Sequence, residues 1–296
     1  MPQPLHVVIL AAGAGTRMKS TLPKVLQKVA GKPMLGHVID TAHSLHAEAI
    51  HVVYGHEGQQ VLDAFAQQQD LRWAEQKERL GTGHAVQQVI GNVPDNARVL
   101  VLYGDVPLIT VNALEELLRN ERPFAVLVAD LADPNGYGRV VRNEQGHVSA
   151  IVEQKDATEE QRQVDEVNSG VFAFDGRVLA DALQKLDSNN AQGELYITDV
   201  LEIARTAGHG VGAHVAADPA ELAGVNDRVQ LAAAGRELNR RMVEKAMRGG
   251  ATIVDPETTW IGVNVTVGSD VIIHPGTELW GATSIADNAE IGPDTT

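Results

Sequence analysis

The sequence predicts an α/β protein in which a mixed, mainly parallel sheet is followed by a long helix and the first coils of a parallel β-helix. Three observations lead to this prediction. Short apolar runs alternate with segments of helical spacing, a helix-forming stretch without proline begins near residue 227, and aliphatic residues then recur every six positions. Strands that alternate with helices favour a parallel sheet, whereas a six-residue period favours a β-helix.

The predicted sheet rests on four short apolar runs, at residues 7–10, 51–54, 99–103 and 124–128. Between these runs apolar side chains recur at helical spacing, as at Leu35, Val38, Ile39, Ala42 and Leu45. From about Gly136 the pattern becomes hairpin-like, with a turn at residues 143–146. We therefore expect one α/β domain over residues 1–226.

Residues 227–250 form the predicted connecting helix, which is rich in Ala, Leu, Arg and Glu and ends at two glycines. Within residues 251–296 six aliphatic residues follow one another at six-residue intervals: Ile261, Val267, Ile273, Leu279, Ile285 and Ile291. In a hexapeptide β-helix each such side chain fills the interior at a corner of the coil. A solenoid needs several stacked repeats and a cap, so we expect the β-helix to be incomplete in this chain.

Composition limits the classes of function. The net charge of −15 argues against a protein that binds nucleic acid or an anionic membrane through a global field. No stretch approaches the roughly 20 apolar residues of a membrane span, and the short apolar run near the N-terminus lacks the basic start of a signal peptide. The absence of cysteine excludes disulfides and thiol catalysis and fits a reducing compartment. We expect a cytoplasmic protein.

The charge is unevenly distributed along the chain. Residues 1–39 contain no acidic residue but include five basic ones: Arg17, Lys19, Lys24, Lys28 and Lys32. In a strongly acidic protein, such a segment is compatible with a local anion site and equally with a solvated basic face. Composition alone leaves both interpretations open.

A glycine-rich motif directly follows the first predicted strand; its residues are Leu10, Ala11, Ala12, Gly13, Ala14, Gly15, Thr16, Arg17 and Met18. Glycines at the end of a strand let the backbone turn tightly and present N–H groups to a phosphate. The motif is not the dinucleotide fingerprint, because Met18 replaces its third glycine, and no GxxxxGK[ST] loop occurs. With Arg17 in the loop and Lys24 seven residues later, it suits a triphosphate.

Further motifs follow in order, at residues 22–26, Gln76, 80–85, 102–107, 136–139, 151–153, 166–170, 190–194 and 224–226. Together with the glycine loop they resemble the nucleotidyltransferase domain of the bifunctional GlmU family, the N-acetylglucosamine-1-phosphate uridylyltransferases. The resemblance covers nearly all of residues 5–296. It implies a Rossmann-like, GT-A-like nucleotidyltransferase domain followed by the start of a left-handed parallel β-helix.

The resemblance also implies a metal site. Asp105 and Asn226 are expected to bind Mg²⁺, which favours oxygen ligands and retains waters. Arg17, Lys24 and Asp105 are the implied catalytic residues. Taken alone, Asp105 and Asn226 are also suited to cap the helices expected after them, and for Asn226 the two roles are compatible.

The implied substrate contacts fall into two groups. Gln76 has an amide that both donates and accepts, which complements the edge of uracil, and we expect it to read the base together with the backbone near Gly81 and Thr82. Further nucleotide contacts are implied for Leu10, Ala11, Ala12, Gly13, Lys24, Tyr103, Gly104, Asp105 and Asn226. The implied sugar contacts are Tyr137, Gly138, Glu153, Asn168 and Thr198, and these rest on the resemblance alone.

The implied reaction joins UTP and N-acetylglucosamine 1-phosphate to give UDP-N-acetylglucosamine and pyrophosphate, for peptidoglycan and lipopolysaccharide precursors. A sugar 1-phosphate has a second pKa of about 6, so it is largely a dianion at neutral pH and needs no general base. Full-length members of the family form homotrimers through the β-helix and acetylate glucosamine 1-phosphate farther along it; we expect that acetyltransferase activity to be absent from this chain. The alternatives are another sugar-1-phosphate nucleotidyltransferase and a non-catalytic regulatory relative.

Overall fold

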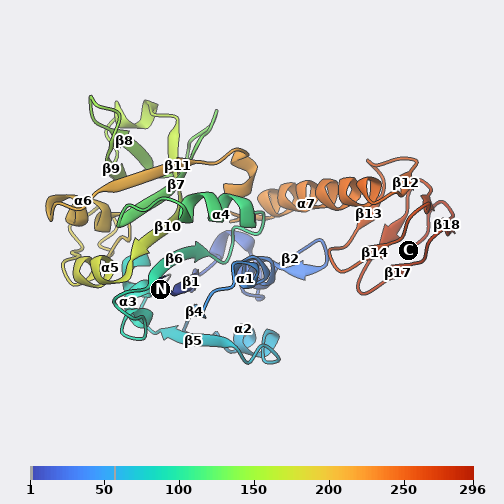
Figure 1. The fold of residues 1–296 in the computed structure, drawn as a ribbon, viewed down its shortest axis with the longest axis horizontal. Coiled ribbons are helices and arrows are strands. Elements are labelled where there is room, and N and C mark those ends of the chain that lie inside the picture. The colour runs from blue at the N-terminus through green and yellow to red at the C-terminus, as the bar shows by residue number, and fades with distance from the viewer. Residues whose placement is uncertain (1–2, 57) are drawn as a thin grey trace.

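The computed structural model describes residues 3–56 and 58–296. Figure 1 shows a larger part built around a sheet and a smaller stack of coils, joined by one long helix. The helices are α1 (Met34–Ser44), α2 (Gln59–Ala64), α3 (Thr82–Ile90), α4 (Val111–Leu118), α5 (Gly176–Leu183), α6 (Asp199–Thr206) and α7 (Arg228–Arg248).

The strands of the larger part are β1 (Leu5–Ala11), β2 (Lys28–Val29), β3 (Lys32–Pro33), β4 (Ala49–Gly55), β5 (Leu71–Gln76), β6 (Arg98–Tyr103), β7 (Phe124–Asp130), β8 (Arg139–Arg142), β9 (Val148–Val152), β10 (Glu166–Asp175) and β11 (Val211–Val215). Nine of them form one sheet, in which seven follow the order β11-β7-β10-β6-β1-β4-β5 and β8 and β9 lie off this path. β1 pairs in parallel with β4 and β6, β4 with β5, and β7 with β11, whereas β10 is antiparallel to both of its neighbours. The predicted mixed, mainly parallel sheet is therefore confirmed.

Both faces of this sheet are covered, which explains why β1 is apolar at every position from Val7 to Ala11. Val7 and Ile9 pack with residues of α1, α2 and α4 on one face. Val8 and Leu10 pack with residues of α3, α5 and α6 on the other face. The hairpin β8–β9 attaches to β10 at the side of the sheet. Because β1 and β6 are parallel neighbours, their carboxyl ends lie next to each other, and the loops that follow them meet at one edge.

The helix caps decide one question that the sequence left open. Thr110, not Asp105, caps α4, because its hydroxyl accepts a hydrogen bond from the Ala113 N–H at 3.2 Å. Asp227, not Asn226, caps α7 and accepts from two backbone N–H groups at 2.9 and 2.8 Å. The side chains of Asp105 and Asn226 are therefore not used as caps.

The smaller part consists of two-residue strands: β12 (Thr252–Ile253), β13 (Trp260–Ile261), β14 (Thr266–Val267), β15 (Ile272–Ile273), β16 (Glu278–Leu279), β17 (Ser284–Ile285) and β18 (Glu290–Ile291). They form three separate parallel ladders, β12-β15-β18, β13-β16 and β14-β17. Trp260 pairs with Glu278, a separation of 18 residues or three six-residue repeats. Aliphatic side chains of the repeats, such as Ile261 and Ile273, pack inside the coils together with Val243 of α7. In the part of the chain that the structure describes, no helix is long and apolar enough to cross a membrane.

Two histidines are buried inside the sheet. His6 of β1 and His51 of β4 are 2% and 1% exposed, and His6 Nδ1 lies 3.2 Å from His51 Nε2. Burial lowers the pKa of both rings, and the charge of His6 lowers that of His51 further, to about 4. The unfolded chain takes up protons on these rings below about pH 6.5, whereas the folded chain does not. Stability conferred by the neutral pair is therefore present above about pH 6.5 and is lost as the pH falls toward 4.

We expect the urea midpoint of unfolding to decrease between pH 6.5 and pH 4. The free energy of unfolding should fall by an amount on the order of 1 to 3 kcal/mol because of His51. The variant His51→Gln should show a smaller decrease over this range, because one buried ring no longer titrates. His147, which is exposed, provides the control substitution His147→Gln. An unchanged pH dependence in His51→Gln would contradict this explanation.

Candidate functional site

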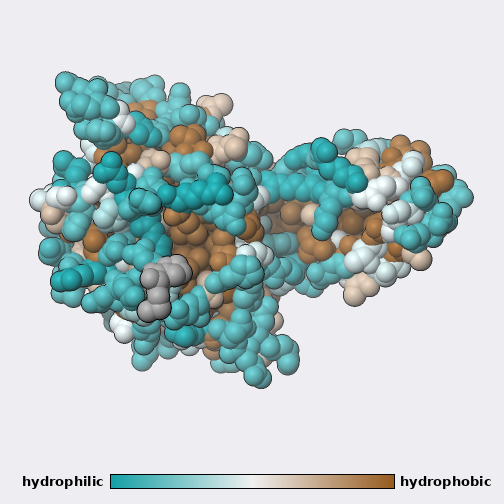
Figure 2. Space-filling model, viewed as in Figure 1, coloured by the Kyte–Doolittle hydropathy of each residue, from teal (hydrophilic) through white to brown (hydrophobic). Residues whose placement is uncertain are grey.

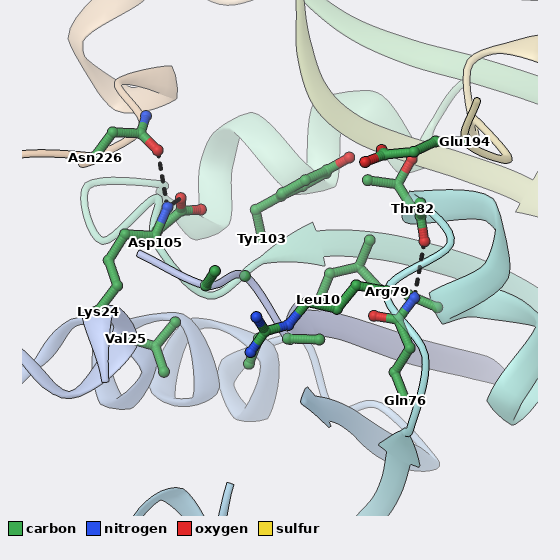
Figure 3. Close-up of a pocket in the computed structure, with 16 residues that line it drawn as sticks. Leu10, Lys24, Val25, Gln76, Arg79, Thr82, Tyr103, Asp105, Glu194 and Asn226 are labelled. Carbon is green, nitrogen blue, oxygen red and sulfur yellow. Dashed lines mark hydrogen bonds and ion pairs between the residues drawn. The ribbon is translucent and has the colours of Figure 1, made fainter. Parts of the chain in front are cut away.

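A cavity of about 430 Å³ lies at the carboxyl ends of β1, β5 and β6 (Figure 3). Its lining residues are Leu10, Ala11, Ala12, Gly13, Ala14, Lys24, Val25, Gln76, Arg79, Gly81, Thr82, Ala85, Tyr103, Asp105, Glu194 and Asn226. Open α/β sheets bind ligands at this edge, and small-molecule sites commonly have volumes of roughly 300–1,000 Å³. Most of the residues predicted to contact a nucleotide are therefore brought together.

The glycine loop after β1 places Lys24 in this cavity. Gly15 has a φ of 61°, and a Cβ built on it would lie 2.6 Å from Lys24 Cβ. Any side chain at position 15 would therefore collide with the stem of Lys24 and adopt an unfavourable backbone conformation. At Gly13 a Cβ would have no neighbour within 4 Å, so this part of the loop borders open space in the cavity.

Lys24 contacts the side-chain oxygens of two residues that come from distant parts of the chain. Its ammonium group forms an ion pair with the Asp105 carboxylate and donates a hydrogen bond to Asn226 Oδ1 at 2.9 Å (Figure 3). The Val225 N–H donates to the Asp105 carbonyl oxygen at 2.9 Å, which holds the segment before α7 against the loop after β6. Lys24 is only 9% exposed, so a positive charge is held in a largely buried position between the two oxygens.

This donor set fits a magnesium ion. A carboxylate and an amide oxygen are hard ligands, and Mg²⁺ usually combines one or two of them with waters and phosphate oxygens. The position already holds a cation, the Lys24 ammonium. Among the described residues no group of three or more His, Cys, Asp or Glu side chains is arranged to bind a metal. A Mg²⁺ ion bound by Asp105 and Asn226 would therefore complete its coordination with water and phosphate.

Gln76 lies at the opposite end of the cavity and is 4% exposed. Its Nε2 donates to the Gly81 carbonyl oxygen at 2.9 Å and lies 3.2 Å from His84 Nδ1. A carbonyl oxygen only accepts hydrogen bonds, so this contact fixes the orientation of the amide. Figure 3 shows the Gln76 amide oxygen turned toward the cavity, where it is available to a donor on a ligand.

The loop at Gly81 and Thr82 is fixed by a second segment of the chain. Gly81 has a φ of 108°, and a Cβ there would lie 2.5 Å from the Leu195 carbonyl oxygen. That oxygen accepts from the Gly83 N–H at 2.7 Å, and Thr82 Oγ1 accepts from the Ile197 N–H at 3.0 Å. The close approach of the two segments brings Glu194 to the rim of the cavity.

Four residues predicted to contact the sugar form a second group. The Thr198 hydroxyl donates to Glu153 Oε1 at 3.2 Å, and the Asn168 N–H donates to the Gly138 carbonyl oxygen at 2.9 Å. A Cβ at Gly138 would lie 3.5 Å from Glu153 Oε2. Burial raises the pKa of Glu153, although the Thr198 hydrogen bond opposes this effect. Polar groups that can bind hydroxyls are thus gathered near a half-buried carboxyl group.

Tyr103 links this second group to the cavity, which it lines. Burial raises the pKa of the Tyr103 hydroxyl, and the nearby charge of Glu153 raises it further. Gly170 makes room for the ring, because a Cβ there would lie 2.7 Å from Tyr103 Cε2. The phenol therefore remains protonated and lies between the two groups of polar residues.

Three further predicted residues belong neither to the cavity lining nor to this second group. Arg17 is exposed on the short turn Thr16–Met18. Gly104 is buried, and a Cβ there would lie 3.2 Å from a Leu35 methyl group. Tyr137 lines a separate apolar cavity of about 200 Å³.

Sequence reasoning missed Arg79 and Glu194, which line the cavity. The only signal for Arg79 was a cationic residue between the two predicted base-reading elements, Gln76 and Gly81.

Comparisons with known proteins place the chain among nucleotidyltransferases. Residues 7–197 match the family model of the MobA-like NTP transferase domain. Three similar curated relatives are each named "Bifunctional protein GlmU". The one from Corynebacterium aurimucosum is 62% identical over 299 residues, which cover 98% of this chain and 61% of the relative. The relative from Corynebacterium glutamicum is 57% identical, covering 98% and 62%, and that from Stenotrophomonas maltophilia is 51% identical, covering 99% and 64%.

The chain thus spans a little over three fifths of the length of these relatives. Among solved structures, a Bacillus anthracis protein assigned as a glucose-1-phosphate thymidylyltransferase, crystallised with sucrose, aligns with a TM-score of 0.63. The alignment covers 78% of this chain and 94% of that protein at 20% identity, which shows a shared fold. From the cavity geometry, this fold and the match over residues 7–197, the chain belongs to the family of proteins with a MobA-like NTP transferase domain.

Proposed function

We propose that this chain transfers a uridylyl group from UTP to N-acetylglucosamine 1-phosphate, forming UDP-N-acetylglucosamine and pyrophosphate. The observation that carries the proposal is the buried cation position formed by Lys24, Asp105 and Asn226 beside a glycine loop. A cavity with this feature suits a nucleoside triphosphate and its metal ion. The resemblance to the GlmU family, and relatives of that name up to 62% identical, support the choice of substrates.

The base end of the proposed substrate lies at Gln76. Its amide nitrogen is occupied by the Gly81 carbonyl oxygen, so its oxygen acts as an acceptor in the cavity. Uracil carries a hydrogen on N3 and donates to such an acceptor, whereas N3 of cytosine has no hydrogen. Backbone groups of Gly81 and Thr82 complete the base contacts, and the ribose lies toward Leu10, Ala11 and Ala12.

The phosphates lie between the glycine loop and the cation position. Backbone N–H groups near Gly13 and the charges of Lys24 and Arg17 neutralise the triphosphate. When bound at Asp105 and Asn226, Mg²⁺ supplies further charge neutralisation at the phosphate oxygens. Lys24 then donates to phosphate oxygens instead of to these two residues.

The reaction is an in-line displacement. An oxygen of the sugar 1-phosphate attacks the α-phosphorus of UTP, a new P–O bond forms, and the bond to pyrophosphate breaks with its electron pair leaving on pyrophosphate. The attacking phosphate is already a dianion, so no residue needs to remove a proton. The protein contributes positioning and charge. Glu153 and Asn168 bind the sugar hydroxyls, and the acetamido group is held by Tyr137, Gly138 and Thr198. Gly104 keeps the loop beside Asp105 compact.

We further propose the division of the chain into a nucleotidyltransferase domain (1–226), a linking helix (227–250) and the start of a left-handed parallel β-helix (251–296). The parallel ladders with a separation of 18 residues support the last assignment.

The proposed product is a precursor of peptidoglycan and lipopolysaccharide made in the cytoplasm. The full-length protein is proposed to be a trimer through its β-helix.

The test is a pyrophosphate-release assay with purified protein, UTP, Mg²⁺ and N-acetylglucosamine 1-phosphate. We expect rapid release with this pair of substrates and much slower release with glucose 1-phosphate or with CTP, ATP, GTP or dTTP. A preference for another sugar phosphate or nucleotide would replace the proposed substrates, and no release with any pair would contradict a transferase function.

The cation position gives a sharper prediction. Asp105→Ala and Asn226→Ala should each lower kcat by at least about 100-fold at a fixed Mg²⁺ concentration, because each removes a proposed metal ligand. Raising the Mg²⁺ concentration should restore part of the rate. Asp63→Ala, at an exposed position of α2, serves as the control. Normal turnover of UTP in both site variants would eliminate the metal assignment.

The orientation of the Gln76 amide predicts the base preference. Gln76→Ala should raise the KM for UTP roughly ten-fold, the value of one lost hydrogen bond, and leave the KM for CTP nearly unchanged. The ratio of kcat/KM for UTP to that for CTP should therefore decrease. The control is Gln60→Ala on the exposed side of α2. If the ratio remains as in the unsubstituted protein, Gln76 does not read the base.

A further inference from the structure

The hairpin β2–β3 connects the proposed catalytic residue Lys24 with the coils. Lys24 lies on the short turn Lys24–Leu26, and β2 begins two residues after this turn. The Met34 N–H donates to the Gln27 carbonyl oxygen at 3.0 Å and closes the base of the hairpin. In Figure 1 the hairpin extends from the sheet to the coils, alongside α7.

The tip of this hairpin has an unfavourable backbone conformation. Its two turn residues, Ala30 and Gly31, have φ angles of 47° and 88°. A two-residue hairpin turn with both φ angles positive favours Asn-Gly or Gly-Gly, and alanine is disfavoured in the left-handed region. A two-stranded hairpin is also marginally stable by itself. The tip therefore requires contacts from elsewhere to keep its conformation.

The first two coils supply these contacts. The Val263 N–H donates to the Ala30 carbonyl oxygen at 3.1 Å. The Trp280 ring lies against two glycines, because a Cβ on Gly262 would be 3.2 Å from its Cε3 atom and a Cβ on Gly31 would be 3.7 Å from it. The hairpin tip is thus held between one backbone hydrogen bond and one indole ring.

Beneath the hairpin, a single apolar cluster joins every segment of the proposed cation site. It contains Met18, Val29, Met34, Leu108, Val225, Ala234 and Leu238, with Ala30, Leu231 and Val263 packed against it. Met18 adjoins Arg17, Val225 adjoins Asn226, and Leu108 follows Asp105 in the same loop. Figure 2 shows apolar residues gathered below α7, where the larger part meets the coils.

The first coil is itself fixed to α7. Asn239, which is 6% exposed, donates from Nδ2 to the Thr259 carbonyl oxygen at 2.8 Å and accepts at Oδ1 from the Ile261 N–H at 2.9 Å. Since α7 begins two residues after Asn226, the coil, the helix and the hairpin form one closed set of contacts around the cation site.

We propose that Val263 and Trp280 are positioning residues for nucleotidyl transfer: they hold the tip of the β2–β3 hairpin and thereby hold Lys24 in place relative to Asp105 and Asn226. The inference rests on the proposed function for its kinetic consequence and on the contacts above for its structural one. On this basis the first coils contribute to catalysis at the sheet without touching the substrate.

The primary variant is Trp280→Ala, with Trp280→Phe as the conservative variant that retains a ring. We expect Trp280→Ala to lower kcat about ten-fold, because small displacements of a catalytic group are costly, and Trp280→Phe to recover most of the loss. Hydrogen exchange in the free protein should become faster at the amides of residues 25–34 in Trp280→Ala. The matched control is Ile291→Ala, which weakens the interior cluster of the coils but lies outside the cluster under the hairpin.

A second variant separates positioning from general destabilisation. Ala30→Gly relieves the unfavourable turn conformation, so it should restore part of kcat in the Trp280→Ala background and slow hydrogen exchange in the hairpin. A merely structural role of Trp280 would lower the melting temperature without this rescue.

The inference is overturned if Trp280→Ala keeps the normal kcat and normal exchange at residues 25–34, or if Ile291→Ala reduces kcat equally. The exchange measurement needs no substrate. Faster exchange at residues 25–34 in Trp280→Ala, together with no turnover in the unsubstituted protein, would therefore count against the proposed function and leave the hairpin coupling standing.

Discussion

The interaction on which the site depends is the contact of one buried ammonium group, that of Lys24, with Asp105 and Asn226. Two side-chain oxygens and a cation, from three distant segments of the chain, meet in this contact. A buried carboxylate without a partner is costly, so the pairing stabilises the arrangement before any ligand binds. The same oxygens suit Mg²⁺. We infer that Lys24 neutralises the position in the free protein and turns to the phosphates when the metal ion and nucleotide arrive.

The fold makes this meeting possible. Parallel pairing of β1 with β6 brings the glycine loop and Asp105 to the same edge of the sheet, and the Val225–Asp105 backbone hydrogen bond adds Asn226. At the other end of the cavity, the close contact between Gly81 and Leu195 fixes the loop that holds Gln76. The cavity is therefore defined at both ends by close contacts that only glycine permits, with the Lys24 side chain at Gly15 and with the Leu195 backbone at Gly81.

Much of this could be predicted from the sequence, and the misses have physical reasons. The buried strands are a strong signal, because strands covered on both faces must be apolar throughout. The six-residue period is equally strong, because each coil consists of three six-residue repeats. The roles of Asp105 and Asn226 could not be decided, since capping residues of equal quality, Thr110 and Asp227, lie next to the helices that follow. Glu194 lines the cavity only because its segment packs against the distant loop at Gly81, and no local pattern encodes that packing. Arg79 lies between Gln76 and Gly81, where a single cationic residue is too weak a signal to assign.

The most direct test of the cation site is a crystal of this protein grown with UTP and Mn²⁺, an ion that takes the place of Mg²⁺ and scatters X-rays anomalously. We predict an anomalous peak at a bonding distance of about 2.1 Å from an oxygen of Asp105 and from Asn226 Oδ1. The Lys24 ammonium should have moved to the phosphates. A nucleotide bound in the cavity with Lys24 still paired to Asp105, and with no metal peak at that carboxylate, would contradict the account.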